Sequence, residues 1–291
     1  MARPLLKGFL AAVAAIKANK KYKHTMIRNH STHSLALVAS IALPVLSWAG
    51  TVEKAKAAEP APVASSITGN LGLNMDTRFV SFGQDTWGPS HQPIFHPSIE
   101  LTKAITNDFK LILGTWWDVN DQVPSSIGNR IQEVDVWFGG SYTSGILTTT
   151  ALFQQWMYAG KNEQAVELKF AVDTFLKPSL LIHQRLATGY EGGTVAVLGA
   201  SYDFKAGPVS FSVPAAVSFT TANYWTDGDS GVGFGSLGLT ASVPTEFIAK
   251  GASFSVGVTG YVTNDDVITY NSGASKNSKF VNLTTGFNIP F

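Results

Sequence analysis

Hydrophobic and polar residues alternate one by one along much of the sequence after residue 66. The stretch 163–174 shows the pattern clearly, because alternate positions hold Val166, Leu168, Phe170 and Val172 while the others hold mainly alanine and charged residues. A period of two is that of a β-strand, whose successive side chains point to opposite faces. One face of such a strand suits lipid or a core, and the other suits water.

Twelve segments with this pattern lie between turn signals along the chain. They cover residues 67–84, 94–105, 109–119, 130–143, 146–158, 164–174, 178–189, 193–204, 208–220, 232–244, 251–263 and 278–290. No apolar run after residue 66 approaches the roughly 18 residues that indicate a membrane-spanning helix. Any membrane role of this region must therefore come from strands, which span a bilayer only as a closed barrel.

The connections between these segments fall into two classes that alternate along the chain. The short ones are 106–108, 144–145, 175–177, 205–207 and 245–250, and the longer polar ones include 85–93, 120–129, 221–231 and 264–277. Short periplasmic turns and longer extracellular loops are typical of bacterial outer-membrane barrels. We therefore predict an all-β fold, an antiparallel transmembrane β-barrel of about 12 strands over residues 67–291. A soluble β-sandwich is the alternative, and it leaves the alternation of loop lengths unexplained.

A secretory signal precedes the predicted barrel. Residues 26–57 begin with a basic start at Met26, continue with an apolar stretch over 35–46 and then reach small residues at Ser47 and Ala49. This order of basic, apolar and small residues is typical of a cleaved signal peptide. We therefore expect export through the periplasm to the outer membrane of a Gram-negative bacterium.

Two features of this leader region leave alternatives open. Residues 1–25 are a basic extension that reflects either a mis-assigned upstream start codon or a lengthened leader. The mature chain begins between Gly50 and Ala58, and residues 58–66, rich in alanine, proline and serine, read as a periplasmic linker.

Composition agrees with a protein whose surface is only partly in water. Charged residues make up 14% of the chain, well below the quarter or so found in soluble globular proteins. The net charge of +1 provides no field for nucleic acid, and the absence of cysteine excludes disulfides and thiolate metal sites. No metal-ligand spacing or nucleotide fingerprint occurs, so we expect neither a cofactor nor a metal.

The last predicted strand carries a pattern that resembles a known signature. Apolar residues stand at alternate positions before a terminal aromatic residue, namely Val281, Leu283, Phe287, Ile289 and Phe291. This resembles the C-terminal signature of bacterial outer-membrane proteins, and the resemblance implies recognition by the barrel-assembly machinery.

A second resemblance covers much of the predicted barrel. It rests on Gly69-Asn70-Leu71-Gly72-Leu73, on the stretch 77–84, on Gly114-Thr115-Trp116-Trp117-Asp118-Val119-Asn120 and on Glu133-Val134-Asp135. In order and spacing these segments are similar to the TorF-type porin family, which implies an outer-membrane barrel with outer-membrane lipid around it.

Charged residues gather on the polar positions of the predicted strands, which would face the lumen. They are Asp76, Arg78, Glu100, Asp118, Glu133, Asp135, Glu167, Lys169, Asp173, His183 and Arg185. Such side chains either line a water path or pair with one another across the barrel. Because acids outnumber bases in this set, we predict a porin-like channel for passive diffusion of small hydrophilic solutes or ions, with weak cation selectivity.

Two other classes of function compete with the channel. A lipid-modifying hydrolase would need a nucleophile beside a histidine and an acid. His183 with Glu167 or Asp173 and a neighbouring serine is a conceivable arrangement, but nothing in the spacing marks a nucleophile motif. A structural or surface barrel without an open pore would work through its loops, which are short. We therefore do not expect an enzyme.

Overall fold

A computed structural model describes residues 67–88, 92–158, 161–186, 192–222, 224–225, 227–269 and 278–291. The predicted extension, signal peptide and linker, residues 1–25, 26–57 and 58–66, lie outside the described residues. Within the described part, no helix has the length and apolarity needed to cross a membrane.

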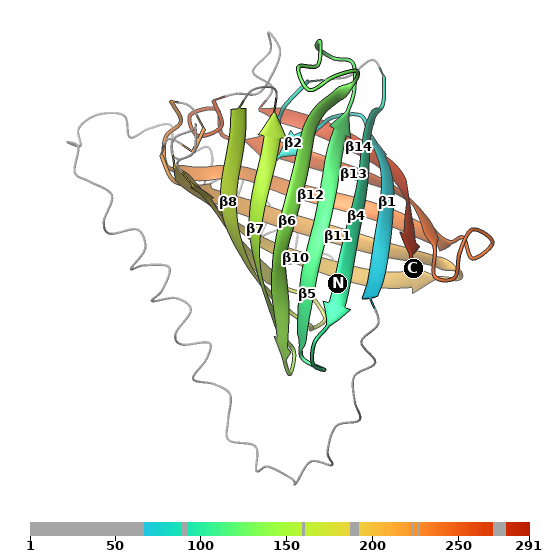
Figure 1. Ribbon diagram of the computed structural model, residues 1–291. Coiled ribbons are helices and arrows are strands. Elements are labelled where there is room, and N and C mark those ends of the chain that lie inside the picture. Colours follow the sequence, from blue (N-terminus) through green and yellow to red (C-terminus); the bar gives the residue numbers. More distant parts are fainter. Residues whose placement is uncertain are drawn as a thin grey trace, which may run out of the picture.

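Twelve strands close into one antiparallel barrel, which confirms the predicted fold class. They are β1 (Ile67–Asp76), β4 (Ile94–Ala104), β5 (Phe109–Val119), β6 (Ile131–Ser144), β7 (Leu147–Tyr158), β8 (Lys161–Val172), β9 (Ser179–Leu186), β10 (Gly193–Ala206), β11 (Val209–Thr220), β12 (Gly231–Pro244), β13 (Ser253–Thr263) and β14 (Lys279–Pro290). From β4 onward each strand pairs with the next along the chain, and β1 pairs with both β4 and β14. The result is a wall of tilted strands without a free edge (Figure 1).

The first predicted strand, 67–84, was too long. Strand β1 ends at Asp76, and the chain then forms a small separate hairpin from β2 (Val80–Ser81) and β3 (Gln84–Asp85). The turn residues Phe82 and Gly83 both have positive φ, 45° and 84°, as a tight two-residue hairpin turn requires. The apolar residues change from odd positions in β1 to even positions at Val80 and Phe82, a break in phase that agrees with the end of the strand.

The connections at the two barrel ends differ as predicted, with two exceptions. The turns at 105–108, 145–146, 173–178, 207–208 and 245–252 lie at the end that also holds Ile67 and Phe291, which we call the turn end. The opposite end, the loop end, carries the connections 77–93, 120–130, 187–192, 221–230 and 264–278. The exceptions are the connection 159–160, which is short although it lies at the loop end, and 245–252, which is long for a turn.

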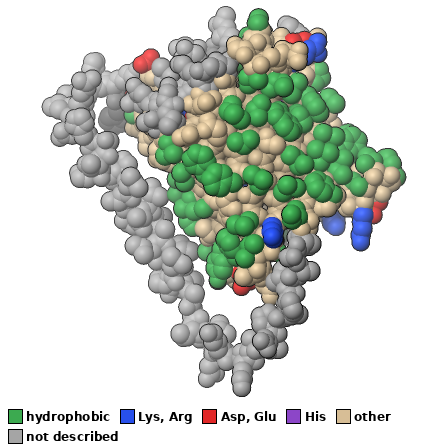
Figure 2. All heavy atoms as spheres, viewed as in Figure 1, with side chains coloured by type: hydrophobic (Ala, Val, Ile, Leu, Met, Phe, Trp, Pro, Cys, Tyr) green, Lys and Arg blue, Asp and Glu red, His purple; other side chains and the backbone are tan. Residues whose placement is uncertain are grey.

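The outward face of the wall is apolar. Phe138, Leu198, Phe219 and Leu283 lie on the outward register and keep between 50% and 58% of their surface exposed. Hydrophobic side chains accordingly spread across the wall in Figure 2. Exposure of large apolar side chains over a whole barrel is unfavourable in water and favourable against lipid.

The seam between the two ends of the chain is closed by Phe291. Its backbone exchanges two hydrogen bonds with Gly69, of 2.7 and 2.9 Å. Its ring covers Gly69 so closely that a Cβ atom there would stand 2.2 Å from the ring. Glycine at position 69 is therefore required by the seating of the terminal aromatic ring against β1.

Candidate pore lining and the hairpin inside the barrel

Hairpin β2–β3 folds into the loop half of the barrel, where its tip residue Phe82 lies among side chains of the wall. The Phe82 ring centroid is 6.2 Å from that of Trp156 on β7 and 4.7 Å from that of His183 on β9. Phe234 of β12 lies against the neighbouring Gly83, where an added Cβ would meet its ring at 2.5 Å. Because β7, β9 and β12 occupy different parts of the circumference, the tip reaches across the lumen.

Polar contacts anchor the base of the hairpin to the wall. Arg78 and Asp85, at its two ends, form an ion pair. The Trp87 indole Nε1 donates a 2.7 Å hydrogen bond to Asp118 of β5. Burial raises the pKa of the Asp85 carboxyl, and its contact with Arg78 acts in the opposite direction. The ring of Phe79 adds an aromatic contact with Trp116, at 5.2 Å between centroids.

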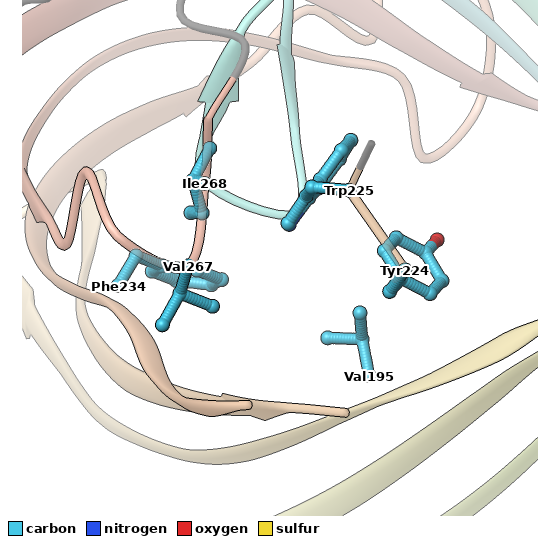
Figure 3. Close-up of a cluster of buried hydrophobic side chains, with 6 residues drawn as sticks. All are labelled: Val195, Tyr224, Trp225, Phe234, Val267 and Ile268. Atoms are coloured by element: carbon cyan, nitrogen blue, oxygen red, sulfur yellow. The ribbon is translucent and has the colours of Figure 1, made fainter. Parts of the chain in front are cut away.

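Apolar residues fill the part of the loop half next to β10 and β12 (Figure 3). The cluster consists of Val195, Tyr224, Trp225, Phe234, Val267 and Ile268. Two of its members come from the connection 221–230 and two from 264–278, so both connections fold toward the wall strands. Phe82 packs against this cluster. Burial raises the pKa of the Tyr224 phenol.

Ion pairs connect several of the charged residues that face inward. Arg185 Nε donates a 2.5 Å hydrogen bond to Glu163, and its guanidinium stacks 4.0 Å from the centre of the Tyr224 ring. His96 lies between two carboxylates, with Nδ1 at 2.8 Å from Asp76 and Nε2 at 3.4 Å from Asp118. These groups hold one another in place as a structural network does.

Glu133 and Asp135 stand apart from these networks. Both lie on the inward register of β6, Glu133 opposite Asp118 and Asp135 between Trp116 and Trp156. Glu133 is buried, with 6% of its surface exposed, and Asp135 has a buried oxygen without a hydrogen-bond partner. Among the side chains that the structure describes, no basic group forms an ion pair with either carboxyl.

The turn half of the lumen contains an aromatic residue and, at its rim, an ion pair. Trp137 covers Gly114, where a Cβ would stand 2.3 Å from the indole, and donates a 3.1 Å hydrogen bond to Glu100. At the rim, Lys177 and Asp203 form an exposed ion pair with an N–O distance of 2.6 Å. This contact raises the pKa of the Lys177 amine.

Most of the predicted lumen residues lie on the inward register. They are Asp76, Glu100, Asp118, Glu133, Asp135, Glu167, Lys169, His183 and Arg185. Arg78 and Asp173 do not belong to this group, because β1 ends at Asp76 and β8 ends at Val172. Arg78 belongs to the base of the hairpin, and Asp173 is exposed in a turn.

Sequence reasoning missed several residues of this region. Glu163 shares the register of Glu167 and was available from the period alone. Phe82 and Trp87 were missed because they were assigned to a strand and to an outer loop. Their inward position depends on contacts with distant strands, which no local pattern reveals.

His183 is completely buried, between aromatic rings. Trp156 stacks on it at 4.9 Å between centroids, with Phe82 on another side. Its Nδ1 lies 3.6 Å from Glu167, beyond hydrogen-bond distance. No hydroxyl nucleophile forms a described hydrogen bond with either ring nitrogen. This geometry favours a packing role for His183 over the hydrolase arrangement.

No protein-family model matches the sequence, and no curated protein is significantly similar to it. Among solved structures, a KdgM porin in complex with disordered oligogalacturonate is similar over 77% of this chain and 99% of its own, with a TM-score of 0.44 and 9% identity. A NanC porin is similar over 75% of this chain and 98% of its own, with a TM-score of 0.46 and 8% identity. A Salmonella typhi OmpF complex with Daunomycin is similar over 78% of this chain and 97% of its own, with a TM-score of 0.40 and 8% identity.

Proposed function

We propose that this protein is an outer-membrane channel for passive diffusion of small hydrophilic solutes or ions, narrowed by its β2–β3 hairpin and weakly selective for cations. The apolar wall supports the membrane placement, since a closed barrel with an apolar outer face is suited to lipid. The leader sequence and the resemblance to TorF-type porins support export to the outer membrane. In this orientation the turn end faces the periplasm and the loop end faces outward.

Glu133 and Asp135, two inward carboxyl groups that form no ion pair with a described basic group, carry the proposal. An ionised carboxylate that is buried without a partner is costly, and an apolar side chain of similar size would serve packing better. Both residues line the wall beside Trp116 and Trp156, the two indoles that contact the hairpin phenylalanines. Carboxyl groups that face the lumen beside the hairpin and form no ion pair with a described basic group are suited to stabilise a passing cation.

The experiment is a reversal-potential measurement across a salt gradient, on purified protein in a planar bilayer. Replacing Glu133 by Gln together with Asp135 by Asn should move the reversal potential toward zero, because two inward carboxyl groups that can attract a cation are removed. Glu246→Gln, in the exposed turn between β12 and β13, is the matched control and should leave the potential unchanged. No conductance at all, or a preference for anions that the double substitution does not alter, contradicts the proposal.

The C-terminal strand at the seam is also a candidate recognition signal for assembly. We propose that the apolar positions Val281, Leu283, Phe287 and Ile289 with Phe291 are read by the barrel-assembly machinery. Their side chains lie on the outward register of β14, where a membrane-embedded partner can reach them.

A further inference from the structure

Lys103 is unusual on the outer wall of this barrel. By register, the outward positions of the described strands hold only two charged residues, Lys103 on β4 and Lys279 on β14. Lys279 begins β14 at the loop end, whereas Lys103 stands next to the last residue of β4, at the turn end. Lys103 is exposed and has no ion pair or hydrogen bond with any side chain of the described ranges.

An apolar groove begins beside this lysine. It has a volume of about 340 Å³, and its lining includes Lys103, Ile67, Leu101, Leu111, Leu113 and Phe138. Lys103 is opposite Leu111 on one side and Ile67 on the other in the strand pairing, so the amine stands at the end of the apolar lining. Phe138, Leu113 and Ile67 expose 58%, 56% and 62% of their surface. The groove is therefore accessible to the lipid that surrounds the barrel.

We propose that this groove binds one anionic phospholipid of the leaflet at the turn end, with its phosphate on the Lys103 amine and an acyl chain along Leu101, Leu111 and Phe138. A lysine stem lies along apolar surface and brings its charge to the level of the headgroups. The complementary charge at that level is a lipid phosphate. The inference goes beyond channel activity and depends only on the lipid-facing wall.

The test is native mass spectrometry of the full barrel in neutral detergent with phosphatidylglycerol added. The wild-type protein should retain one lipid, and Lys103→Gln should weaken retention about fivefold, the equivalent of about 1 kcal/mol for one lysine near an anionic surface. Lys279→Gln removes the other outward charge and should leave retention unchanged. Lys103→Arg keeps the charge and should preserve binding, which separates loss of the site from a folding defect.

The acyl-chain part of the proposal is tested separately. Phe138→Ala removes one side of the groove and should reduce retention while Lys103 is intact, whereas Phe219→Ala, also outward but on β11, should not. Inorganic phosphate should fail to displace the lipid, because it has no chain to occupy the groove. Equal losses in the Lys103 and Lys279 variants, or displacement by inorganic phosphate, would overturn the inference.

Discussion

Replacing Phe82 by alanine is expected to release the β2–β3 hairpin from the lumen. The ring of Phe82 lies within 6.2 Å, between centroids, of Trp156, His183 and Tyr224. Its backbone holds a φ of 45°, a region that bulky residues occupy only when their surroundings compensate the strain. Packing of the ring is therefore what holds the tip of the hairpin inside.

The size of the effect follows from these contacts. Each aromatic pair contributes about 0.5–1.5 kcal/mol beyond area burial, and removing a fully buried phenylalanine costs about 3–5 kcal/mol. Phe82 is only partly buried, so we expect a loss of about 2 kcal/mol, below the range for full burial. Since 1.4 kcal/mol is a factor of ten, the population with the hairpin displaced should rise about thirtyfold.

Single-channel recording in a planar bilayer measures this population directly. The wild-type channel should show a low conductance with rare steps to a higher level, and Phe82→Ala should spend much more time at the higher level. Phe219→Ala removes a half-exposed ring from the outer wall and is the control that should behave as wild type. An unchanged distribution of conductance levels in Phe82→Ala would refute the view that the hairpin narrows the passage.

Three further sets of variants test the seam, the wall and the buried ion pair. Deleting Phe291, or replacing Gly69 by Val so that the Phe291 ring cannot pack against β1, should slow assembly. The measurement is the loss of the heat-modifiable band in gel electrophoresis. Normal assembly of both variants would contradict the role of Phe291 in closing the barrel. Leu283→Arg should lower the free energy of unfolding by up to about 2–4 kcal/mol if the site is near the bilayer midplane, measured by urea titration in lipid vesicles. Glu163→Gln should cost up to about 3–5 kcal/mol because the buried Arg185 loses the negative charge of Glu163, and adding Arg185→Met should recover part of this loss in the same titration.

Strand positions were predictable because each wall strand has lipid on one face and the lumen on the other. This constraint gives the sequence of each strand a period of two. The predicted strand 109–119 accordingly has the same bounds as β5. The same period assigned Glu133 and Asp135 correctly to the inward face, because a shift of one residue would place both charges in lipid.

The hairpin was not predictable in this way. The apolar residues of β1 stand at odd positions up to Met75, whereas Val80 and Phe82 stand at even positions. This change of phase marks the end of the strand but does not show where the following residues go. Trp87 lies in the predicted loop 85–93 and Trp156 near the end of the predicted strand 146–158, positions where indoles commonly meet the headgroups, yet both point into the lumen. A tryptophan suits a membrane interface and a packed polar interior equally well, and only contacts between distant strands distinguish the two.

The base of the hairpin is joined to the strand that follows all others in the chain. Thr77 N donates a 3.0 Å hydrogen bond to the Leu283 carbonyl, and Arg78 N donates one of 2.9 Å to the Asn282 side chain. These bonds cannot form until β14 has arrived beside β1. A barrel caught before closure would consequently lack these two bonds at the base of its hairpin, so that closure of the wall completes the anchoring of the hairpin late in biogenesis.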